Sequence, residues 1–525
     1  MVKVLDGPEI VIGLVGAVGA QLDDIFEKLQ KHLDTIGYES DHIKVIELLE
    51  EMNFPRYFRA FGSEHKGKSY HWKMNAGNDF RRVLASSDVL ARLAIRRIRN
   101  TRAERNRALK RPGEQPIPSR AYILNSLKRP EEVNLLRDVY GDSFHLVSVY
   151  ATRERRKTEL EKRIGDSKIK TSEDVEAIAE ALIRRDHREK DEEYGQKVRD
   201  TFPEADFFVD ATMNKGIDKP IDRFVQLLFG NEFESPSKDE LGMFMAFGAR
   251  LRSADLARQV GACIMSTRGD VIALGTNDVP RAGGGLYWAD DDYKNPEDDG
   301  RDFVSGRDES NVRRRKIFND TVDLLQERGI IDFATAEKLN SAEAFEALRD
   351  GKLMAVTEYG RSVHAEMAAI TDSARRGSAI AESVLYTSTF PCHNCAKHIV
   401  AAGVDRVVYV HPYPKSEVAA MYKDSISIDT ESPARRVNFQ TFVGIAPRRY
   451  EDFFAMKQKR KDDDGKVLKW LVQPKTVVLR IETSPLLYLR NEGVAVDDLE
   501  ALLKQRQDRL NTPVDPSKLG AKEES

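Results

Sequence analysis

The chain has 525 residues, of which 41% are hydrophobic and 32% charged, and its formal net charge is −3. This length exceeds what one hydrophobic core usually supports, so we expect two to four domains. The near-neutral charge excludes a global electrostatic attraction to nucleic acid or membrane, and three cysteines exclude a disulfide framework. The apolar run 9–20 is shorter than the roughly 20 residues of a membrane span. With no signal peptide at the start, we expect a cytoplasmic protein.

Residues 1–235 predict an α/β domain with a doubly wound parallel sheet. An apolar run over 11–15 is followed by Gly16, Gly19 and an amphipathic stretch over 22–33, which indicates strand, glycine turn and helix. Further apolar and amphipathic runs alternate in the order strand, helix, strand, strand, and that alternation is typical of a parallel sheet. They lie at 121–124, 130–140, 144–150 and 207–209. The highly charged residues 153–200 predict exposed helices between them.

The segment Gly16–Asp23 lies where a P-loop would bind phosphate. The pattern G-x-x-x-x-G-K-[ST] needs a lysine that reaches the β- and γ-phosphates. Here Gln21, Leu22 and Asp23 replace the second glycine, the lysine and the hydroxyl residue. We therefore predict a P-loop NTPase or nucleotide kinase-like domain with a degenerate Walker A loop. It should fold and regulate the rest of the chain, but it should not hydrolyse nucleotide.

A basic stretch between Arg92 and Arg120 is the second feature of this domain. Such a stretch is usually a solvated helix face, and the alternative is a contact with an anion or RNA. Residues of this domain that could hold a regulatory nucleotide or RNA are Gly16, Gly19, Arg96, Arg97, Arg102 and Arg105.

The second domain is expected over 236–490, because Ser235-Pro236 is a helix-start signal after a polar linker. A polar and acidic insertion occupies 283–351. Residues 491–525 are charged and lack apolar periodicity, which predicts a loose tail. The other expected elements are a helix over 241–256, a hairpin of strands 260–265 and 271–275, a strand from 384, a helix ending near 402 and a strand over 406–410.

The strongest functional signal is His364-Ala365-Glu366 followed by Pro391-Cys392-His393-Asn394-Cys395. Cysteines three residues apart at a helix start lie on one face, and the helix N-terminus favours their thiolate forms. A catalytic zinc takes three protein ligands and keeps one position for water. We therefore predict His364, Cys392 and Cys395 as ligands of Zn²⁺, with Glu366 as the proton shuttle. The alternatives are a structural zinc site or a buried cysteine pair.

The spacing H-x-E…P-C-x-x-C is the signature of zinc deaminases. With Val260-Gly261-Ala262 and the segment 275–280, it resembles the deoxycytidylate deaminases over about 236–430. The resemblance implies a three-layer α/β/α cytidine deaminase-like domain. It also implies attack of activated water on C4 of cytosine, proton transfer from Glu366 to N3, a sugar contact by Asn277 and a substrate contact by Ala365.

The segment 413–416 follows a strand end, where open α/β sheets bind ligands. Its side chains can donate hydrogen bonds to phosphate, and the alternative is an ordinary surface turn made by two prolines. The predicted phosphate contacts are Tyr413, Lys415 and Ser416.

As a whole, the chain resembles the bacterial anti-phage dCTP deaminases, which join a P-loop kinase-like domain to a deaminase domain. The resemblance implies deamination of dCTP, leaves dCMP open as a second substrate, and implies depletion of dCTP during phage infection. Two other functions stay open, a cytidine deaminase of single-stranded DNA or RNA and a non-catalytic nucleotide sensor. A strand-binding site should carry aromatic residues among basic ones, which the sequence near His364 and Cys392 lacks, and a sensor has no use for Glu366.

The resemblance also predicts a homo-oligomer, with a hexamer favoured, because related deoxycytidylate deaminases complete their sites near subunit contacts. Multi-angle light scattering of the active protein should therefore give a mass several times the 59.5 kDa of one chain. A single 59.5 kDa species with full activity would refute the expectation.

Overall fold

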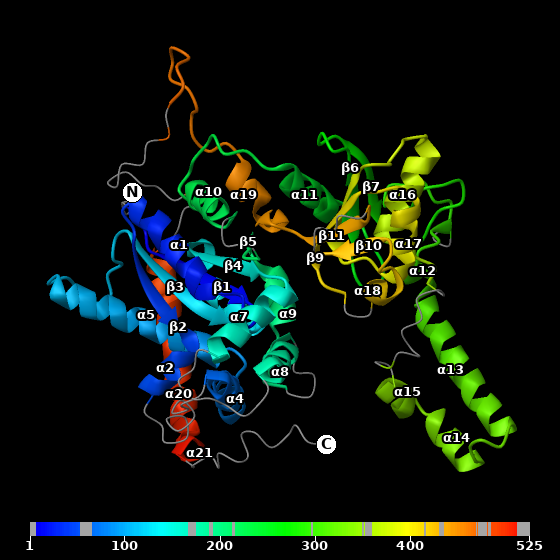
Figure 1. The fold of residues 1–525 in the computed structure, drawn as a ribbon, viewed down its shortest axis with the longest axis horizontal. Helices are drawn as coiled ribbons and strands as arrows, with labels where there is room; N and C mark the ends of the chain where they lie inside the picture. The colour runs from blue at the N-terminus through cyan, green and yellow to red at the C-terminus, as the bar shows by residue number, and fades with distance from the viewer. Residues whose placement is uncertain are drawn as a thin grey trace. The chain divides into compact units, whose positions relative to one another are not determined.

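The computed structural model describes residues 7–52, 66–165, 175–187, 193–212, 216–295, 298–348, 351, 360–413, 416–429, 435–468, 470, 480 and 485–511. The chain divides into two compact units (Figure 1). The first combines Met1–Pro236 with Val443–Ser525, and the second is Ser237–Phe442. Each unit contains one six-stranded sheet.

The sheet of the first unit has the strand order β12-β5-β4-β1-β3-β2. Its neighbouring strands are parallel except for β12, which pairs antiparallel with β5. This confirms the expected parallel α/β arrangement. The strands are β1 Ile10–Gly16, β2 Glu39–Lys44, β3 Arg120–Leu127, β4 Phe144–Tyr150, β5 Phe207–Asp210 and β12 Gly444–Ile445.

Helices cover both faces of this sheet. Side chains at alternate positions of a strand point to opposite faces, and Ile10, Ile12 and Leu14 belong to one hydrophobic core while Val11 and Val15 belong to another. Strands buried on both faces read as continuous apolar runs, which is why β1 was visible in the sequence. The helices on the first side are α1 Leu22–Thr35, α10 Asp218–Leu228 and α19 Tyr450–Phe454. Those on the second side are α2 Leu48–Glu51, α4 Lys66–Leu84, α5 Val89–Ala108, α6 Pro130–Tyr140 and α20 Pro485–Gln505.

The predicted exposed helices over 153–200 are α7 Arg153–Gly165 and α8 Val175–His187, followed by the short α9 Val198–Thr201. They are not exposed all round, because each helix has buried positions. Leu160, Ile164 and Leu182 are buried in a small core that α7 and α8 share. Strand β2 was not expected, because its sequence is polar and only Ile43 is buried.

Two expectations for the C-terminal residues differ from the structure. The second unit ends at Phe442 rather than at 490, and part of the expected loose tail is helical. Beyond Phe442 the chain is part of the first unit. There β12 extends the sheet beside β5, and Tyr488, Ala495 and Leu499 of α20 are buried in the core on α5 and α6. This apolar stripe was missed because a buried glutamate, Glu492, interrupts it. A short helix, α21 Gln507–Asn511, follows, and the rest of the tail lies outside the described residues.

The sheet of the second unit has the order β10-β11-β9-β8-β6-β7, with β6 antiparallel to both neighbours and the other pairs parallel. Helix α11 packs on one face and helices α16 and α17 on the other, so the unit has three layers. The hairpin around 266–269 is present. The strands are β6 Gly261–Met265, β7 Val271–Thr276, β8 Val384–Thr389, β9 Arg406–His411, β10 Ile426–Ile428 and β11 Val437–Thr441. The helices are α11 Lys238–Arg250, α16 Ala365–Arg376, α17 His393–Ala401 and α18 Val418–Met421.

The insertion between β7 and α16 is helical. It contains α12 Asp302–Ser305, α13 Glu309–Glu327, α14 Phe333–Leu339 and α15 Ala342–Leu348. Phe318, Val322 and Ala336 form a small core of their own, onto which Phe345 packs. The long helix α13 runs away from the sheet and carries α14 near its far end (Figure 1). Throughout the described segments of both units, no helix is long and apolar enough to cross a membrane.

A buried charged cluster joins α20 to the first unit. The guanidinium of Arg102 donates to Glu9 at 2.8 Å and to Glu492 at 2.6 Å, and the Tyr488 hydroxyl donates to Glu9 at 3.1 Å. Arg102 is 2% exposed and Glu492 is fully buried. A buried charge is tolerated only when it is paired and hydrogen-bonded, so this arginine is a structural element rather than part of a solvated face.

Replacing Glu492 by alanine should therefore destabilise the first unit by about 3–5 kcal/mol, because Arg102 would lose one of two buried counter-ions. Urea denaturation followed by circular dichroism would measure the change. The matched control is Glu500→Ala on the same helix, since Glu500 is exposed and lies 3.8 Å from Arg96, and exposed pairs contribute about 0–1 kcal/mol. Equal effects of the two substitutions would contradict the assignment.

Candidate functional site

Two helix starts meet at the floor of the second unit's site. His364 is the N-cap of α16, and Cys392 is the N-cap of α17, whose Sγ accepts a hydrogen bond from the Cys395 N–H at 3.4 Å. Cys395 lies in the first turn of α17. Because N–H groups at a helix start point outward without intrahelical partners, both starts favour negatively charged groups.

The position of α16 depends on a close approach to β7. A Cβ atom at Gly275 would overlap the backbone of Ala365 and Ala369, so only glycine lets the first turn of α16 lie directly on the strand. The residue before His364 is also anchored, because Val363 and Asp278 exchange backbone hydrogen bonds across an isolated antiparallel bridge. These contacts hold His364 beside the start of α17.

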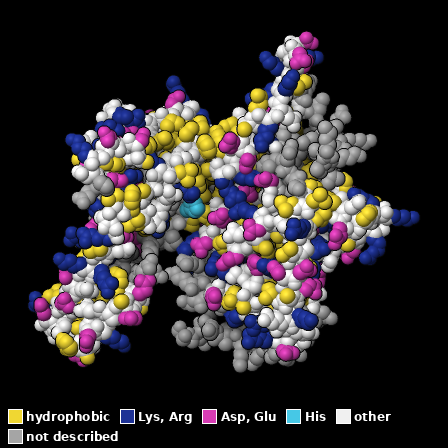
Figure 2. Space-filling view, turned by 180° about the vertical axis from the view of Figure 1, so that it is seen from behind, with side chains coloured by type: hydrophobic (Ala, Val, Ile, Leu, Met, Phe, Trp, Pro, Cys, Tyr) yellow, Lys and Arg dark blue, Asp and Glu magenta, His cyan; other side chains and the backbone are white. Residues whose placement is uncertain are grey.

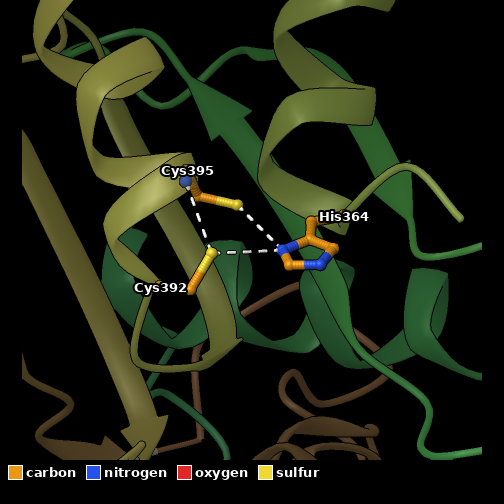
Figure 3. A group of neighbouring side chains, drawn as sticks. All are labelled: His364, Cys392 and Cys395. Carbon is orange, nitrogen blue, oxygen red and sulfur yellow. Dashed lines mark hydrogen bonds between the residues drawn. The ribbon is translucent and has the colours of Figure 1, made fainter. Parts of the chain in front are cut away.

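The predicted ligands converge on one point (Figure 3). His364 Nδ1 lies 3.2 Å from Cys392 Sγ and 3.3 Å from Cys395 Sγ. Ligands of a tetrahedral zinc ion with a nitrogen and a sulfur donor are roughly 3.5 Å apart. One nitrogen and two sulfur atoms at this spacing therefore fit Zn²⁺, and they leave a fourth position for a non-protein ligand. Among the described residues, this is the one such His/Cys/Asp/Glu group.

The side chains of this cluster shift one another's pKa values through their hydrogen bonds. The hydrogen bond with Cys395 is the largest effect that lowers the pKa of Cys392 to about 4, and it raises the pKa of Cys395 well above its usual value. The hydrogen bond with Cys392 is the largest effect that raises the pKa of His364 to about 9. Metal ligands must be deprotonated, so binding of a zinc ion would release these protons from the cluster.

Glu366 lies beside the cluster and is 4% exposed. Its Oε2 accepts a hydrogen bond from the Cys395 thiol at 3.4 Å. Burial is the largest effect on the Glu366 carboxyl and raises its pKa, while the nearby charge of His364 opposes the rise. A carboxyl whose pKa is raised above its ordinary value holds a proton more readily, which suits a group that must both accept and donate one in general acid–base catalysis.

A cavity of about 250 Å³ opens above the cluster. It is lined by His364, Glu366 and Cys392 and by three of the predicted substrate residues, Asn277, Ala365 and Tyr413. Both polar atoms of the Asn277 side chain bind backbone, since Oδ1 accepts from the Val260 N–H at 2.6 Å and Nδ2 donates to the Arg258 carbonyl at 2.8 Å. Asn277 therefore fixes the loop at the cavity wall, and its sugar contact stays a prediction.

The predicted phosphate segment is only partly at the cavity. Tyr413 lines it, whereas the Ser416 hydroxyl donates to the Pro391 carbonyl at 2.8 Å and so braces the turn that leads into Cys392. Lys415 lies outside the described residues.

Several lining residues were not anticipated from the sequence. Arg258 comes from the loop before β6, Asp308 and Arg314 come from the insertion at the start of α13, and Arg361 pairs with Asp302 of the insertion at 2.7 Å. The insertion is therefore part of the wall of the site. The sequence offered only the run Arg313-Arg314-Arg315 as a signal, and periodicity alone does not tell which of these arginines faces a cavity.

In the first unit, the loop after β1 binds the carboxylate of Asp186, a residue of the same chain. The Val18 N–H donates to Asp186 Oδ2 at 2.6 Å, and Lys128 Nζ donates to Asp186 Oδ1 at 2.8 Å and to the Gly16 carbonyl at 3.1 Å. A backbone N–H in a glycine-containing loop and an ammonium group are what a P-loop offers a phosphate. Here a fully buried carboxylate from α8 takes both.

A cavity of about 380 Å³ adjoins this loop and is lined by residues 16–23 and by basic side chains. The basic residues are already neutralised by acidic neighbours. The pairs are Lys44 with Asp23, Lys73 with Glu47, Arg81 with Glu132, Lys128 with Asp186 and Arg163 with Glu159. The absence of nucleotide hydrolysis and the P-loop kinase relationship both stay predictions.

The four arginines proposed to hold a regulatory anion are also paired. Arg96 lies 3.8 Å from Glu500, Arg97 lies 3.4 Å from Glu51, Arg105 lies 2.6 Å from Asp41, and Arg102 is buried as described above. The structure therefore does not gather them into a basic surface. On the face drawn in Figure 2, basic and acidic side chains are likewise interspersed.

Comparison with known proteins concerns the second unit. Residues 236–411 match the family described as the cytidine and deoxycytidylate deaminase zinc-binding region. A probable deoxycytidylate deaminase of Drosophila melanogaster is 27% identical over 172 residues, which are 33% of this chain and 58% of the fly protein. The deoxycytidylate deaminase of Enterobacteria phage T4 is 40% identical over 55 residues, which are 10% of this chain and 28% of the phage protein. The second unit thus contains a cytidine/deoxycytidylate deaminase superfamily domain over residues 236–411. The chain spans at most 58% of the length of these relatives.

Among solved structures, the dCMP deaminase of cyanophage S-TIM5 in its apo form is 16% identical. The similarity covers 40% of this chain and all of that protein, with a TM-score of 0.21.

The Asp186 carboxylate at the loop after β1 leads to a testable prediction. In Asp186→Ala, the Val18 N–H and the Lys128 ammonium lose their carboxylate, so inorganic pyrophosphate should raise the melting temperature of the variant and leave that of the wild type unchanged. Thermal unfolding with and without pyrophosphate would measure this. Adding Lys128→Ala should abolish the response, and an unresponsive Asp186→Ala protein would show that the loop does not bind phosphate. The wild-type protein should release no phosphate from ATP or GTP.

Proposed function

We propose that the second unit catalyses zinc-dependent hydrolytic deamination of deoxycytidine nucleotides, dCTP and also dCMP, to deoxyuridine nucleotides. The observation that carries the proposal is the convergence of His364, Cys392 and Cys395 next to a buried carboxyl, Glu366, at the floor of a cavity. The match of residues 236–411 to the deaminase zinc-binding region supports the same reaction class. In a purely structural zinc site, four protein ligands would close the coordination shell.

The reaction replaces the C4–N4 bond of cytosine by a C4–O bond, consumes one water and releases ammonia. His364, Cys392 and Cys395 would hold Zn²⁺, which supplies Lewis acidity and makes water a nucleophile near neutral pH. Glu366 accepts a proton from the attacking water and passes it to N3 of the ring. It then takes the second proton from the new hydroxyl group on C4 and gives it to the leaving amine, so that ammonia departs and the C4 carbonyl forms. Because Glu366 is buried, solvent does not compete for these protons.

The biological role that we propose is depletion of dCTP during phage infection, with regulation by the first unit. The role in infection is supported by the resemblance of the sequence motifs, and regulation is proposed because the chain has a further folded unit beside the one that carries the site. The proposed homo-oligomer rests on the resemblance to the deoxycytidylate deaminases.

Replacing Glu366 by glutamine should keep the metal and lower kcat by roughly 10²–10⁴-fold, because the amide cannot carry the proton. Ammonia release from dCTP would measure activity, and elemental analysis would measure bound zinc. The contrasting variant is Cys392→Ser, which should lose zinc and activity together. Turnover near wild type in Glu366→Gln would exclude the proposed mechanism.

The same assay separates the competing functions. Wild-type protein should release ammonia from dCTP or dCMP faster than from CTP or single-stranded DNA. A preference for the polynucleotide would favour a strand-specific deaminase. Binding of nucleotides without ammonia release from any substrate would favour a sensor.

A further inference from the structure

The cavity above the His/Cys cluster has an arginine at its edge whose charge is not used elsewhere. Arg258 is exposed, and its guanidinium lies over the ring of Tyr413 at 5.4 Å from the ring centre. Within the part of the chain that the structure describes, no carboxylate forms an ion pair with this guanidinium. A guanidinium stacked on an aromatic ring keeps the N–H donors at its edge free for a ligand.

The backbone that carries Arg258 is held from two sides. Its N–H donates to Asp255 Oδ1 at 3.3 Å, and its carbonyl accepts from Asn277 Nδ2 at 2.8 Å. Asn277 also binds the Val260 N–H, so one buried amide spans the loop on both sides of Gln259. The loop is thus preorganised, which lowers the entropic cost of holding a ligand.

A second arginine reaches the same cavity from the insertion. Arg314 lies in the second turn of α13, whose N-cap Asp308 accepts hydrogen bonds from the N–H groups of Ser310 and Asn311. The Arg314 guanidinium donates to the Ser310 carbonyl at 3.3 Å and to Asn311 Oδ1 at 2.7 Å, and its side chain lines the cavity. Burial raises the pKa of Tyr413, and the charges of Arg258 and Arg314, which line the same cavity, oppose this rise.

The acidic residues of the cavity wall are engaged in other contacts. Asp255 accepts from the backbone N–H groups of Ala257 and Arg258 and from the Ser362 hydroxyl at 2.8 Å. Asp308 caps α13, and Asp302 pairs with Arg361. They organise the wall without forming an ion pair with Arg258.

We propose that Arg258 and Arg314 bind the phosphate tail of the nucleotide, and that Arg314 lets the insertion favour long tails over short ones. The proposal rests on the proposed function, since it places the cytosine at the cluster and the tail at the cavity edge. Guanidinium groups recognise phosphate through paired, charge-assisted hydrogen bonds. A triphosphate carries more negative charge than a monophosphate, so a second guanidinium stabilises the longer tail more.

Steady-state kinetics of Arg258→Ala and Arg314→Ala would test this with dCTP, dCMP and deoxycytidine as substrates. Loss of a hydrogen bond to a charged group costs about 1.5–3 kcal/mol, so KM for dCTP should rise roughly 10- to 100-fold in each variant. KM for dCMP should rise by a smaller factor in Arg314→Ala, and KM for deoxycytidine should change less than about twofold. The matched control is Arg313→Ala, because Arg313 is exposed on the same helix and does not line the cavity; its KM values should equal those of the wild type.

Binding of the products by isothermal titration calorimetry gives a readout that does not depend on turnover. Both variants should bind dUTP roughly 10- to 100-fold more weakly than the wild type and bind deoxyuridine equally well. An equal loss for the nucleotide and the nucleoside, or no loss for dUTP, would overturn the proposal. If the wild type deaminates no cytosine substrate yet dUTP binding depends on both arginines, the proposed function fails and the phosphate site stands.

Discussion

The site of the second unit depends on how closely α16 can approach β7. Any side chain at Gly275 would overlap the first turn of α16, and that turn carries His364, Ala365 and Glu366. Moving the helix outward would separate His364 from the two cysteines at the start of α17. Ligand atoms must lie within a few tenths of an ångström of their required positions to hold a metal, so the absence of a single Cβ atom is a condition for the whole arrangement.

The wall of the site is built from segments that belong to different parts of the second unit. The loop that carries Arg258 and Asn277 belongs to the three-layer core, whereas α13 belongs to an insertion with its own small core. The ion pair of Arg361 with Asp302 joins the insertion to the segment just before His364. A separately packed element can change without disturbing the cluster, which is why the proposed preference for long phosphate tails is placed in the insertion rather than in the ligands.

In the first unit, internal ion pairs satisfy the groups that a ligand would otherwise use. Asp186 takes the N–H and ammonium donors of the loop after β1, and Arg102 is divided between Glu9 and Glu492. Burying these charges costs free energy unless each is compensated. The two clusters also tie elements that are distant in sequence, α8 to β1 and α20 to α5. They give the unit a defined structure even though its glycine loop lacks the lysine of a phosphate-binding loop.

Local patterns were sufficient for β1, α6, the hairpin of β6 and β7, and the grouping of His364, Glu366, Cys392 and Cys395, because helix starts and alternating strands are encoded within a few residues. The same patterns misjudged α20, whose apolar stripe includes Glu492, and β2, whose side chains are mostly polar. They could not find the partners of Arg258, Asp186 or Arg102, since these depend on contacts between residues separated by up to 390 positions. A charged residue looks the same in sequence whether it faces solvent, a buried counter-ion or a cavity, and only packing in three dimensions selects among the three.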